Sequence, residues 1–143
     1  MPIRTKNIEL YIKEYDKNRY NNWSYDLCLG DEVYITSEKE PKILTPLEPY
    51  VNIRPGDFAL LITQECIAVP PDCMAFISVK FTYKQKGLIN ISGFHVDPNY
   101  QGKIIFSVYN AGPNDILLKL GEPVFMIFFE ELDVPCNKER ESC

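Results

Sequence analysis

The stretch that decides the fold is residues 91–102, ISGFHVDPNYQG, which leads directly into the alternating segment KIIFSVYNAG. Before Asp97, small or polar residues alternate with large ones, which predicts a strand with one face in a core and the other toward a ligand. Pro98 and Asn99 are turn formers, so the pattern predicts a carboxylate at the tip of a β-hairpin, with the ring of Tyr100 beside it. A plain solvated turn is the alternative, because Asp, Pro, Asn and Gly are all common in turns.

Short strand-like segments lie on both sides of this stretch, with turn signals every eight to twelve residues or so. This spacing predicts an all-β barrel or sandwich, and the repeated Pro-Gly, Pro-Pro and Asp-Pro breaks favour a distorted, jelly-roll-like β-barrel. The expected strands cover residues 24–29, 32–36, 50–53, 58–63, 67–69, 74–79, 88–91, 103–109, 116–120 and 124–130.

One helix is expected, over residues 3–15, because Ile8, Tyr11, Ile12 and Tyr15 follow a helical spacing with charged residues on the opposite face. A chain of this length is expected to form a single domain, here residues 1–132, with this helix at its start. Residues 133–143 form a polar tail.

The charge balance and hydropathy exclude several function classes. A formal net charge of −5 argues against nucleic acid as the main partner. No apolar run is long enough for a membrane-spanning helix, and residues 1–10 carry no signal-peptide pattern, so a cytoplasmic protein is expected. Lys80, Lys84 and Lys86 cluster locally and either hold a small anion or form a solvated face.

The cysteines and the single histidine, His95, do not form a zinc site in the sequence. The five cysteines include no CxxC pair, so neither a zinc centre nor another protein-bound metal is predicted. The zinc-dependent nucleobase deaminases, which need His and Cys ligands, are thereby excluded. The cysteines lie at positions 28, 66, 73, 136 and 143.

Several segments, taken in order, resemble the superfamily of dCTP deaminases and trimeric dUTPases. The resemblance implies a small jelly-roll barrel that forms a homotrimer, with each nucleotide site lying between subunits. The segments are SYDL at 24–27 with LG at 29–30, RPGDFAL at 54–60, TQE at 63–65, VPPD at 69–72, VDPNYQG at 96–102, YNAG at 109–112 and LGEP at 120–123.

The same resemblance implies roles for individual residues. Asp97 would be the general base that activates a water, and Tyr100 would pack against the sugar and reject a 2′-hydroxyl. Mg²⁺ would enter only through the nucleotide phosphates. The residues expected to contact the nucleotide are Lys80, Thr82, Gln85, Lys86, Ser92, His95 and Tyr100.

The sequence also departs from the superfamily at catalytic positions. Lys80, Phe81 and Thr82 replace an Arg-Ser-Ser or Arg-Ser-Gly motif that binds phosphates, and Gln85 replaces a further arginine. Ser107 stands where deaminases carry the glutamate that shuttles protons. The tail DVPCNKERESC has no glycine, unlike the arm that closes over the phosphates in dUTPases. Since such catalytic parts are each worth roughly a hundredfold or more, these changes predict degenerate catalysis.

Three hypotheses remain open at this point. The first is a protein that has lost catalysis and binds a nucleotide or a nucleotide-like small molecule at a subunit interface, as a sensor, regulator or sequestering protein. The second is an active enzyme, a dUTP diphosphatase or a dCTP deaminase. The third is a protein-interaction module whose pocket is closed, with Phe81 and Phe94 as the residues that fill it.

Overall fold

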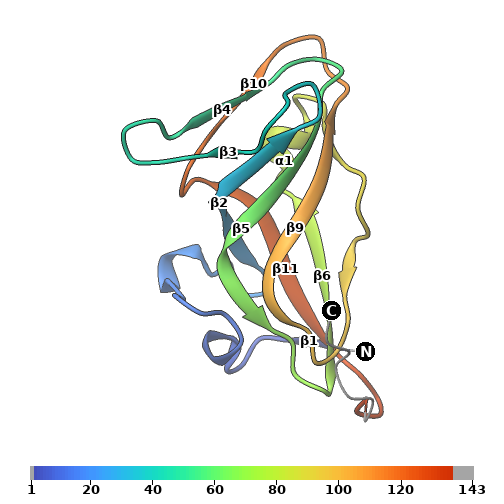
Figure 1. Cartoon of the computed structure of the whole chain (residues 1–143). Coiled ribbons are helices and arrows are strands. Elements are labelled where there is room, and N and C mark those ends of the chain that lie inside the picture. Colours follow the sequence, from blue (N-terminus) through green and yellow to red (C-terminus); the bar gives the residue numbers. More distant parts are fainter. Residues whose placement is uncertain (1, 137–143) are drawn as a thin grey trace.

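The computed structural model describes residues 2–136, and it consists mainly of antiparallel strands (Figure 1). The predicted all-β class is confirmed. Within residues 2–136 no helix is long and apolar enough to cross a membrane. The strands are β1 (Ile3–Arg4), β2 (Tyr25–Ile35), β3 (Lys42–Ile43), β4 (Tyr50–Ile53), β5 (Phe58–Ala68), β6 (Cys73–Val79), β7 (Leu88–Asn90), β8 (His95–Val96), β9 (Gln101–Asn110), β10 (Ile116–Lys119) and β11 (Pro123–Glu131). The helical elements are the 3₁₀ turns η1 (Ile8–Leu10) and η2 (Lys17–Arg19) and the short helix α1 (Phe81–Lys84).

The main sheet has the strand order β7-β9-β5-β2-β11-β6-β8 and curls around the core (Figure 1). β1 extends the sheet at β11, β3 pairs with β2, and β4 pairs with β10 in a small separate sheet. Residues of β6 alternate strictly between buried and half-buried, so one face of the strand packs in the core. At the centre of the core, the rings of Phe106 and Phe125 stack with their centroids 4.0 Å apart.

Two of the expected strands are one continuous strand, because Gly30 does not make a turn. The prediction of separate strands at 24–29 and 32–36, with a stop at Gly30, is wrong. β2 runs through this position and crosses close to β5, where a Cβ on Gly30 would lie 2.8 Å from the Ile62 carbonyl oxygen. The pairing of β2 with β5 also shifts register between Leu29 and Val33. Glycine is needed here for a close backbone approach.

The helix predicted over residues 3–15 is wrong. Asn7 and Glu14 both have left-handed φ values, 62° and 66°, which interrupt a right-handed helix. The backbone in between bonds to β5: the Lys13 N–H donates to the Cys66 carbonyl, and the Tyr11 carbonyl accepts from Ala68 N–H. The apolar spacing predicted burial correctly, since Ile8 and Ile12 are in the core, but hydrogen bonds to the sheet override the local helical preference.

The predicted polar tail, residues 133–143, is described only as far as Cys136. There the chain still follows the barrel, because the Cys136 N–H donates to the Pro71 carbonyl at 2.8 Å. Just before it, Leu132 N–H donates to the Asp72 carbonyl at 2.8 Å. Cys143 and the end of the tail lie outside the described residues.

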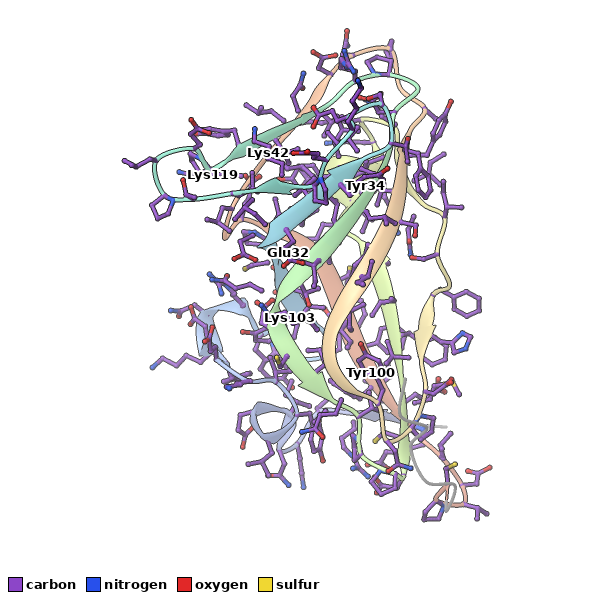
Figure 2. All side chains as sticks on the ribbon, viewed as in Figure 1. Glu32, Tyr34, Lys42, Tyr100, Lys103 and Lys119 are labelled. Carbon is purple, nitrogen blue, oxygen red and sulfur yellow. The ribbon has the colours of Figure 1, made fainter. Side chains whose placement is uncertain are left out.

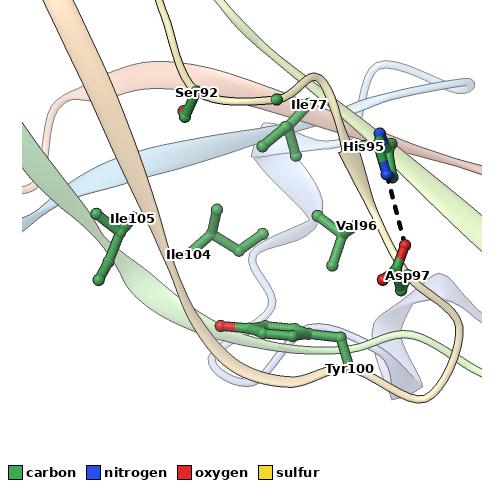
Figure 3. Close-up of a pocket in the computed structure, with 9 residues that line it drawn as sticks. Ile77, Ser92, His95, Val96, Asp97, Tyr100, Ile104 and Ile105 are labelled. Carbon is green, nitrogen blue, oxygen red and sulfur yellow. Dashed lines mark ion pairs between the residues drawn. The ribbon is translucent and has the colours of Figure 1, made fainter. Parts of the chain in front are cut away.

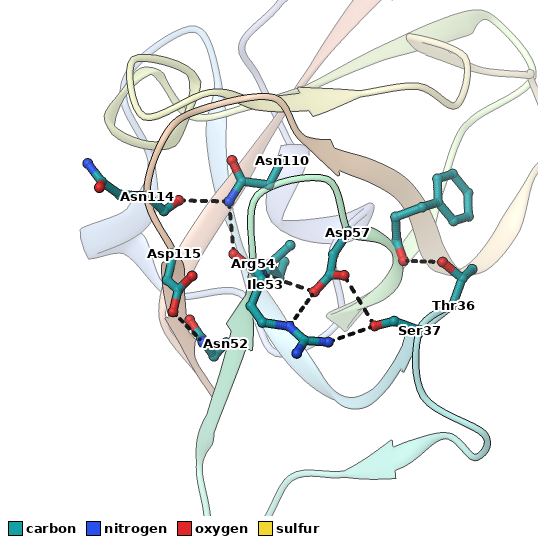
Figure 4. A network of polar contacts seen from close by, with 10 residues as sticks. Thr36, Ser37, Asn52, Ile53, Arg54, Asp57, Asn110, Asn114 and Asp115 are labelled. Carbon is teal, nitrogen blue, oxygen red and sulfur yellow. Dashed lines mark hydrogen bonds and ion pairs between the residues drawn. The ribbon is translucent and has the colours of Figure 1, made fainter.

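A polar network holds the turn between β4 and β5 against the end of β9 (Figure 4). The buried Asn110 donates from Nδ2 to the carbonyls of Ile53 at 2.8 Å and Asn114 at 2.9 Å. Asp57 accepts hydrogen bonds from Arg54 and Ser37. Burial by itself raises the pKa of Asp57, but these hydrogen bonds outweigh it, so the pKa lies below its ordinary value.

The residues directly after helix α1 pack against the turn that follows β9. Gly87, with φ of 102°, and Gly112 lie so close together that a Cβ on Gly112 would overlap the Lys86 carbonyl oxygen. The Ala111 N–H donates to the Gly87 carbonyl at 2.9 Å. These contacts fix the position of α1 relative to β9.

Candidate pocket between β6, β8 and β9

Asp97 lies in a loop between two strands that do not pair with each other. β8 pairs with β6, whereas β9 pairs with β5 and β7, so the chain passes from one edge region of the sheet to the other between Val96 and Gln101. The prediction of a β-hairpin here is therefore wrong. The loop is tight, with Asn99 at φ of 70° and Tyr100 N–H donating to the Asp97 carbonyl at 3.2 Å.

This loop borders a pocket of about 380 Å³ (Figure 3). Four of the site residues predicted from the sequence, Ser92, His95, Asp97 and Tyr100, line this pocket. Apolar side chains from β6, β8 and β9 form the rest of its lining. The lining residues are Ile77, Ser92, Gly93, His95, Val96, Asp97, Tyr100, Ile104 and Ile105.

The polar side of the pocket consists of Ser92, His95 and Asp97. His95 Nε2 lies 3.5 Å from Asp97 Oδ1, and the Asp97 side chain is 78% exposed. Ser92 Oγ donates to Asn90 Oδ1 at 2.6 Å and accepts from Ser107 N–H at 3.1 Å. These two hydrogen bonds fix the Ser92 hydroxyl at the rim, while the carboxylate remains open to an incoming molecule.

Tyr100 forms one wall of the pocket with the face of its ring (Figure 3). Its hydroxyl donates to the Lys103 carbonyl at 2.5 Å, and the ring packs against the core. Gly102 has φ of 142°, and a Cβ there would lie 3.4 Å from the Tyr100 hydroxyl oxygen. The hydrogen bond of its hydroxyl and the packing against the core fix the Tyr100 ring, so the ring presents a flat surface to the pocket.

Some of the residues that were expected to contact the nucleotide lie in the lysine-rich segment, and these do not line the pocket of the same chain. Lys80 precedes α1, and Thr82, Gln85 and Lys86 lie on or directly after it. Figure 1 shows α1 toward one end of the barrel, whereas Tyr100 lies toward the other end in Figure 2. Lys80 Nζ is bound to Asp26 Oδ2 at 2.5 Å, and Lys86 Nζ lies 5.6 Å from the centre of the Tyr83 ring.

Phe81 and Phe94 do not close the pocket. Neither belongs to its lining, and their exposed fractions are 72% and 65%. Phe94 stacks instead on Phe76, with ring centroids 6.1 Å apart, and Phe76 stacks on Phe128 at 5.2 Å. The pocket is therefore open in this structure. The hypothesis of a protein-interaction module had expected Phe81 and Phe94 to close it.

Ser107 is half-buried on β9, opposite Leu60 of β5. Its backbone N–H binds Ser92, and its side chain is a hydroxyl that stays protonated at neutral pH. Of the nine residues that line the pocket, Asp97 is the one with a carboxylate. A proton shuttle through a glutamate of β9 is thus not available at this position.

Two features were not predicted from the sequence. The first lies outside the pocket and is the ion pair between Lys80 and Asp26, whose partners are far apart in the sequence. The second is the apolar wall of Ile77, Ile104 and Ile105, since alternation alone does not tell which end of a strand borders a pocket. Within residues 2–136 no group of three or more His, Cys, Asp or Glu residues is placed to hold a metal ion.

Comparisons with known proteins agree with this architecture. The family model described as dCTP deaminase-like matches residues 3–132. A dCTP deaminase of Thermococcus kodakarensis is 30% identical over 130 residues, covering 90% of this chain and 81% of the relative. A dCTP deaminase of Pyrococcus abyssi is 29% identical over 134 residues, with 90% and 81% coverage.

Solved structures show the same fold. The 2′-deoxycytidine 5′-triphosphate deaminase of Agrobacterium tumefaciens superposes with a TM-score of 0.72 at 15% identity, covering 86% of this chain and 45% of that one. The dUTPase of Staphylococcus bacteriophage 80alpha with dUPNHPP has a TM-score of 0.59 at 13% identity, covering 92% and 88%. With the family match over most of the described barrel, this chain belongs to the dCTP deaminase-like family, and its fold is the jelly-roll barrel shared by dCTP deaminases and dUTPases.

Proposed function

We propose that the chain binds a deoxyribonucleotide in the pocket bordered by Asp97 and Tyr100, as a homotrimer, without deaminating dCTP. The observation that carries this proposal is the convergence of Ser92, His95, Asp97 and Tyr100 on one open pocket. Its volume of about 380 Å³ lies within the range typical of small-molecule sites.

The chemistry of the lining suits a base attached to a sugar. The flat Tyr100 ring and the side chains of Val96 and Ile104 offer apolar contact area, against which a deoxyribose packs well. Ser92 and His95 offer hydrogen-bonding groups for the edge of a base. Asp97 accepts hydrogen bonds from a sugar hydroxyl or from a water.

A trimer would supply what one chain lacks at this pocket. Because Lys80, Thr82, Gln85 and Lys86 are not among the lining residues, they reach a ligand here only from a neighbouring copy. Ile105, on the outer face of β9, is 58% exposed and extends the apolar surface beyond the pocket rim. An exposed apolar side chain beside an incomplete site favours a second copy at this place. Mg²⁺ would accompany only the phosphates of the ligand.

The loss of deamination follows from Ser107. Attack of water on a cytosine ring needs a group that takes up and returns protons near neutral pH, and a serine hydroxyl does not ionise there. Asp97 is an exposed carboxylate that suits the activation of a water for hydrolysis of a diphosphate bond, so dUTP diphosphatase activity is the alternative. Product analysis separates these possibilities directly.

The experiment combines a binding assay with a turnover assay. Thermal unfolding is recorded with deoxycytidine and deoxyuridine and with their mono- and triphosphates, and the mixtures are then analysed by mass spectrometry. A ligand at a hundred times its Kd should stabilise the protein by about 2.7 kcal/mol. The expected result is a raised Tm with no deoxyuridine nucleotide formed from dCTP and no pyrophosphate formed from dUTP. Turnover of either triphosphate contradicts the loss of catalysis, and silence across all six compounds contradicts binding.

Two variants test whether the ligand binds in this pocket. Asp97→Asn should abolish the ligand-induced rise in Tm, whereas Asp133→Asn, an exposed aspartate outside the pocket lining, should leave it intact. Light scattering on the same samples gives the mass of the assembly. A monomer that binds nucleotide with full affinity would contradict the shared site.

A further inference from the structure

We propose that residues 11–19 form a strap that positions the loop of Asp97 and Tyr100 from the opposite edge of β5, with Arg19 as its latch. Opening of the strap weakens ligand binding, and a bound ligand in turn holds the strap closed. The effect on the ligand rests on the proposed function, whereas the positioning of the loop concerns the protein without ligand.

The last residues of β5 lack a strand partner on the side of β2. The pairing of β2 with β5 reaches Leu29 opposite Thr63, and the earlier residues of β2 pair with β11 instead. Without another neighbour, residues 66–68 would therefore form an open strand edge on this side. The strap fills that edge, since Ile12 forms an antiparallel bridge with Ile67, and Figure 1 shows the blue N-terminal segment beside the lower part of β5.

Two backbone hydrogen bonds join the strap to β5. The Lys13 N–H donates to the Cys66 carbonyl at 2.9 Å, and the Ala68 N–H donates to the Tyr11 carbonyl at 2.7 Å. Between these two bonds, the Ile12 side chain is 2% exposed and packs in the core. The strap thus takes the place of a short strand at this edge.

The loop that borders the pocket is bound to the other edge of the same residues. Gly102 of β9 pairs with Ile67. The Val69 N–H donates to the Tyr100 carbonyl at 2.9 Å, and the Asn99 N–H donates to the Val69 carbonyl at 3.0 Å. The loop that carries the Tyr100 ring is therefore held by a piece of strand that the strap holds from its other side. Such a continuous set of contacts is a physical route for coupling the two segments.

A buried carboxylate connects the strap to this part of β5. Glu65 lies where the pairing of β5 with β9 shifts register, and its side chain is 1% exposed. Both of its carboxylate oxygens accept from the Cys28 N–H, at 3.0 and 3.2 Å. From the strap, Arg19 Nη1 reaches to 3.8 Å from Glu65 Oε2. Because the carboxylate is buried, this attraction is weakly screened, so Arg19 holds the strap against the barrel.

Exchange of backbone amides with deuterium in the protein without ligand tests the positioning of the loop. Arg19→Ala should speed exchange of the Lys13 and Ala68 amides, which bond across the strap, by about fivefold. The Val69 and Asn99 amides, which hold the loop, should speed up by a similar factor. Amides of β4 and β10 should not change, because these strands form a separate sheet. The assay is run at about pH 7, which favours the ionised form of Glu65.

Lys17→Ala is the matched control for this variant. Lys17 is exposed and lies in the same 3₁₀ turn as Arg19, so its replacement removes an equal charge from the same element. All of the amides named above should exchange in Lys17→Ala as in the unmodified protein. Faster exchange confined to the two strap amides overturns the coupling, and unchanged exchange throughout Arg19→Ala overturns the role of the latch. An equal rise in β4 and β10 would mean a general loss of stability and also overturns the proposal.

Isothermal titration tests the effect on the ligand. With dCTP and dUTP, each with Mg²⁺, the Kd should be about fivefold higher in Arg19→Ala than in the unmodified protein or in Lys17→Ala. A saturating ligand should also slow exchange of the Lys13 and Ala68 amides in the unmodified protein, because coupling between two sites is reciprocal. Equal Kd values in all three proteins overturn the effect of the strap on binding. If neither compound binds, the proposed function fails, while the exchange rates still decide whether the strap positions the loop.

A double variant tests whether Arg19 acts through the buried carboxylate. Glu65→Gln keeps the shape of the side chain and removes its charge, so adding Arg19→Ala should change neither the exchange rates nor the Kd further. The full fivefold effect of Arg19→Ala in the Glu65→Gln protein would overturn this assignment of the latch.

Discussion

His95 Nε2 lies 3.5 Å from Asp97 Oδ1 at the mouth of the pocket, and both side chains are open to solvent. The two residues are separated by Val96, which points into the core, so they share the outer face of one short strand and the start of its loop. Together with Ser92, this pair forms the polar side of a pocket whose other side chains are mainly apolar.

Replacement of His95 tests its contact with the ligand. His95→Ala should weaken binding of a nucleoside by about tenfold, because a hydrogen bond of the ligand is lost. The unfolding temperature without ligand should change little, since this side chain is about half exposed. Lys103→Ala is the control, because Lys103 is exposed and does not line the pocket. Unchanged affinity in His95→Ala would show that the ring merely borders the site.

Gly30 should not tolerate a side chain. In Gly30→Ala the new Cβ would lie 2.8 Å from the Ile62 carbonyl oxygen and 2.9 Å from that of Thr63, so β2 and β5 must separate. The free energy of unfolding should fall by about 1–3 kcal/mol, measured by urea denaturation. Gly93→Ala is the matched control, because no atom lies within 4 Å of the place that its new Cβ would take, and it should change stability by less than about 0.5 kcal/mol.

Asn110 should contribute strongly to stability although it is polar. Its side chain is fully buried and makes hydrogen bonds to the carbonyls of Ile53 and Asn114 and to the Gly112 N–H. Asn110→Ala removes all three hydrogen bonds, of which the one to the Ile53 carbonyl is buried, so the free energy of unfolding should fall by about 2–4 kcal/mol. Asn52→Ala removes one exposed hydrogen bond to Asp115 and should cost about 0.5 kcal/mol or less. Equal losses in the two variants would disprove this role.

Glu65 should make the stability depend on pH. Burial raises the pKa of Glu65 above its ordinary value, although the Cys28 N–H and Arg19, 3.8 Å away, favour the charged form. Because the folded state holds this proton more tightly than the unfolded chain, the contribution to stability is largest at low pH. It is lost as the pH rises from about 4.3 through the folded pKa.

Glu65→Gln removes this titration. The plot of unfolding free energy against pH should become flatter above about pH 4.3 than in the unmodified protein, as followed by urea denaturation at each pH. Glu48→Gln, in an exposed loop, should leave the shape of the curve unchanged. A steeper curve in Glu65→Gln would mean that the carboxyl is held charged in the fold.

The sequence by itself determined the class of fold, because strand length, alternation and turn residues are local properties. Alternating residues of β9 face the core as predicted, and Ser92, His95, Asp97 and Tyr100 come from one short stretch that the sequence singled out. These four meet because they lie close together along the chain. The tertiary structure adds the apolar wall from Ile77 on another strand.

Only the tertiary structure decided the rest, since it depends on which strands pair. Residues 3–15 are not helical because their backbone groups bond to β5, and β8 pairs with β6 rather than forming a hairpin with β9. Lys80 turns toward Asp26 because β11 brings β2 and β6 to its two sides. Such contacts join residues distant in the sequence, and a local pattern carries no information about them.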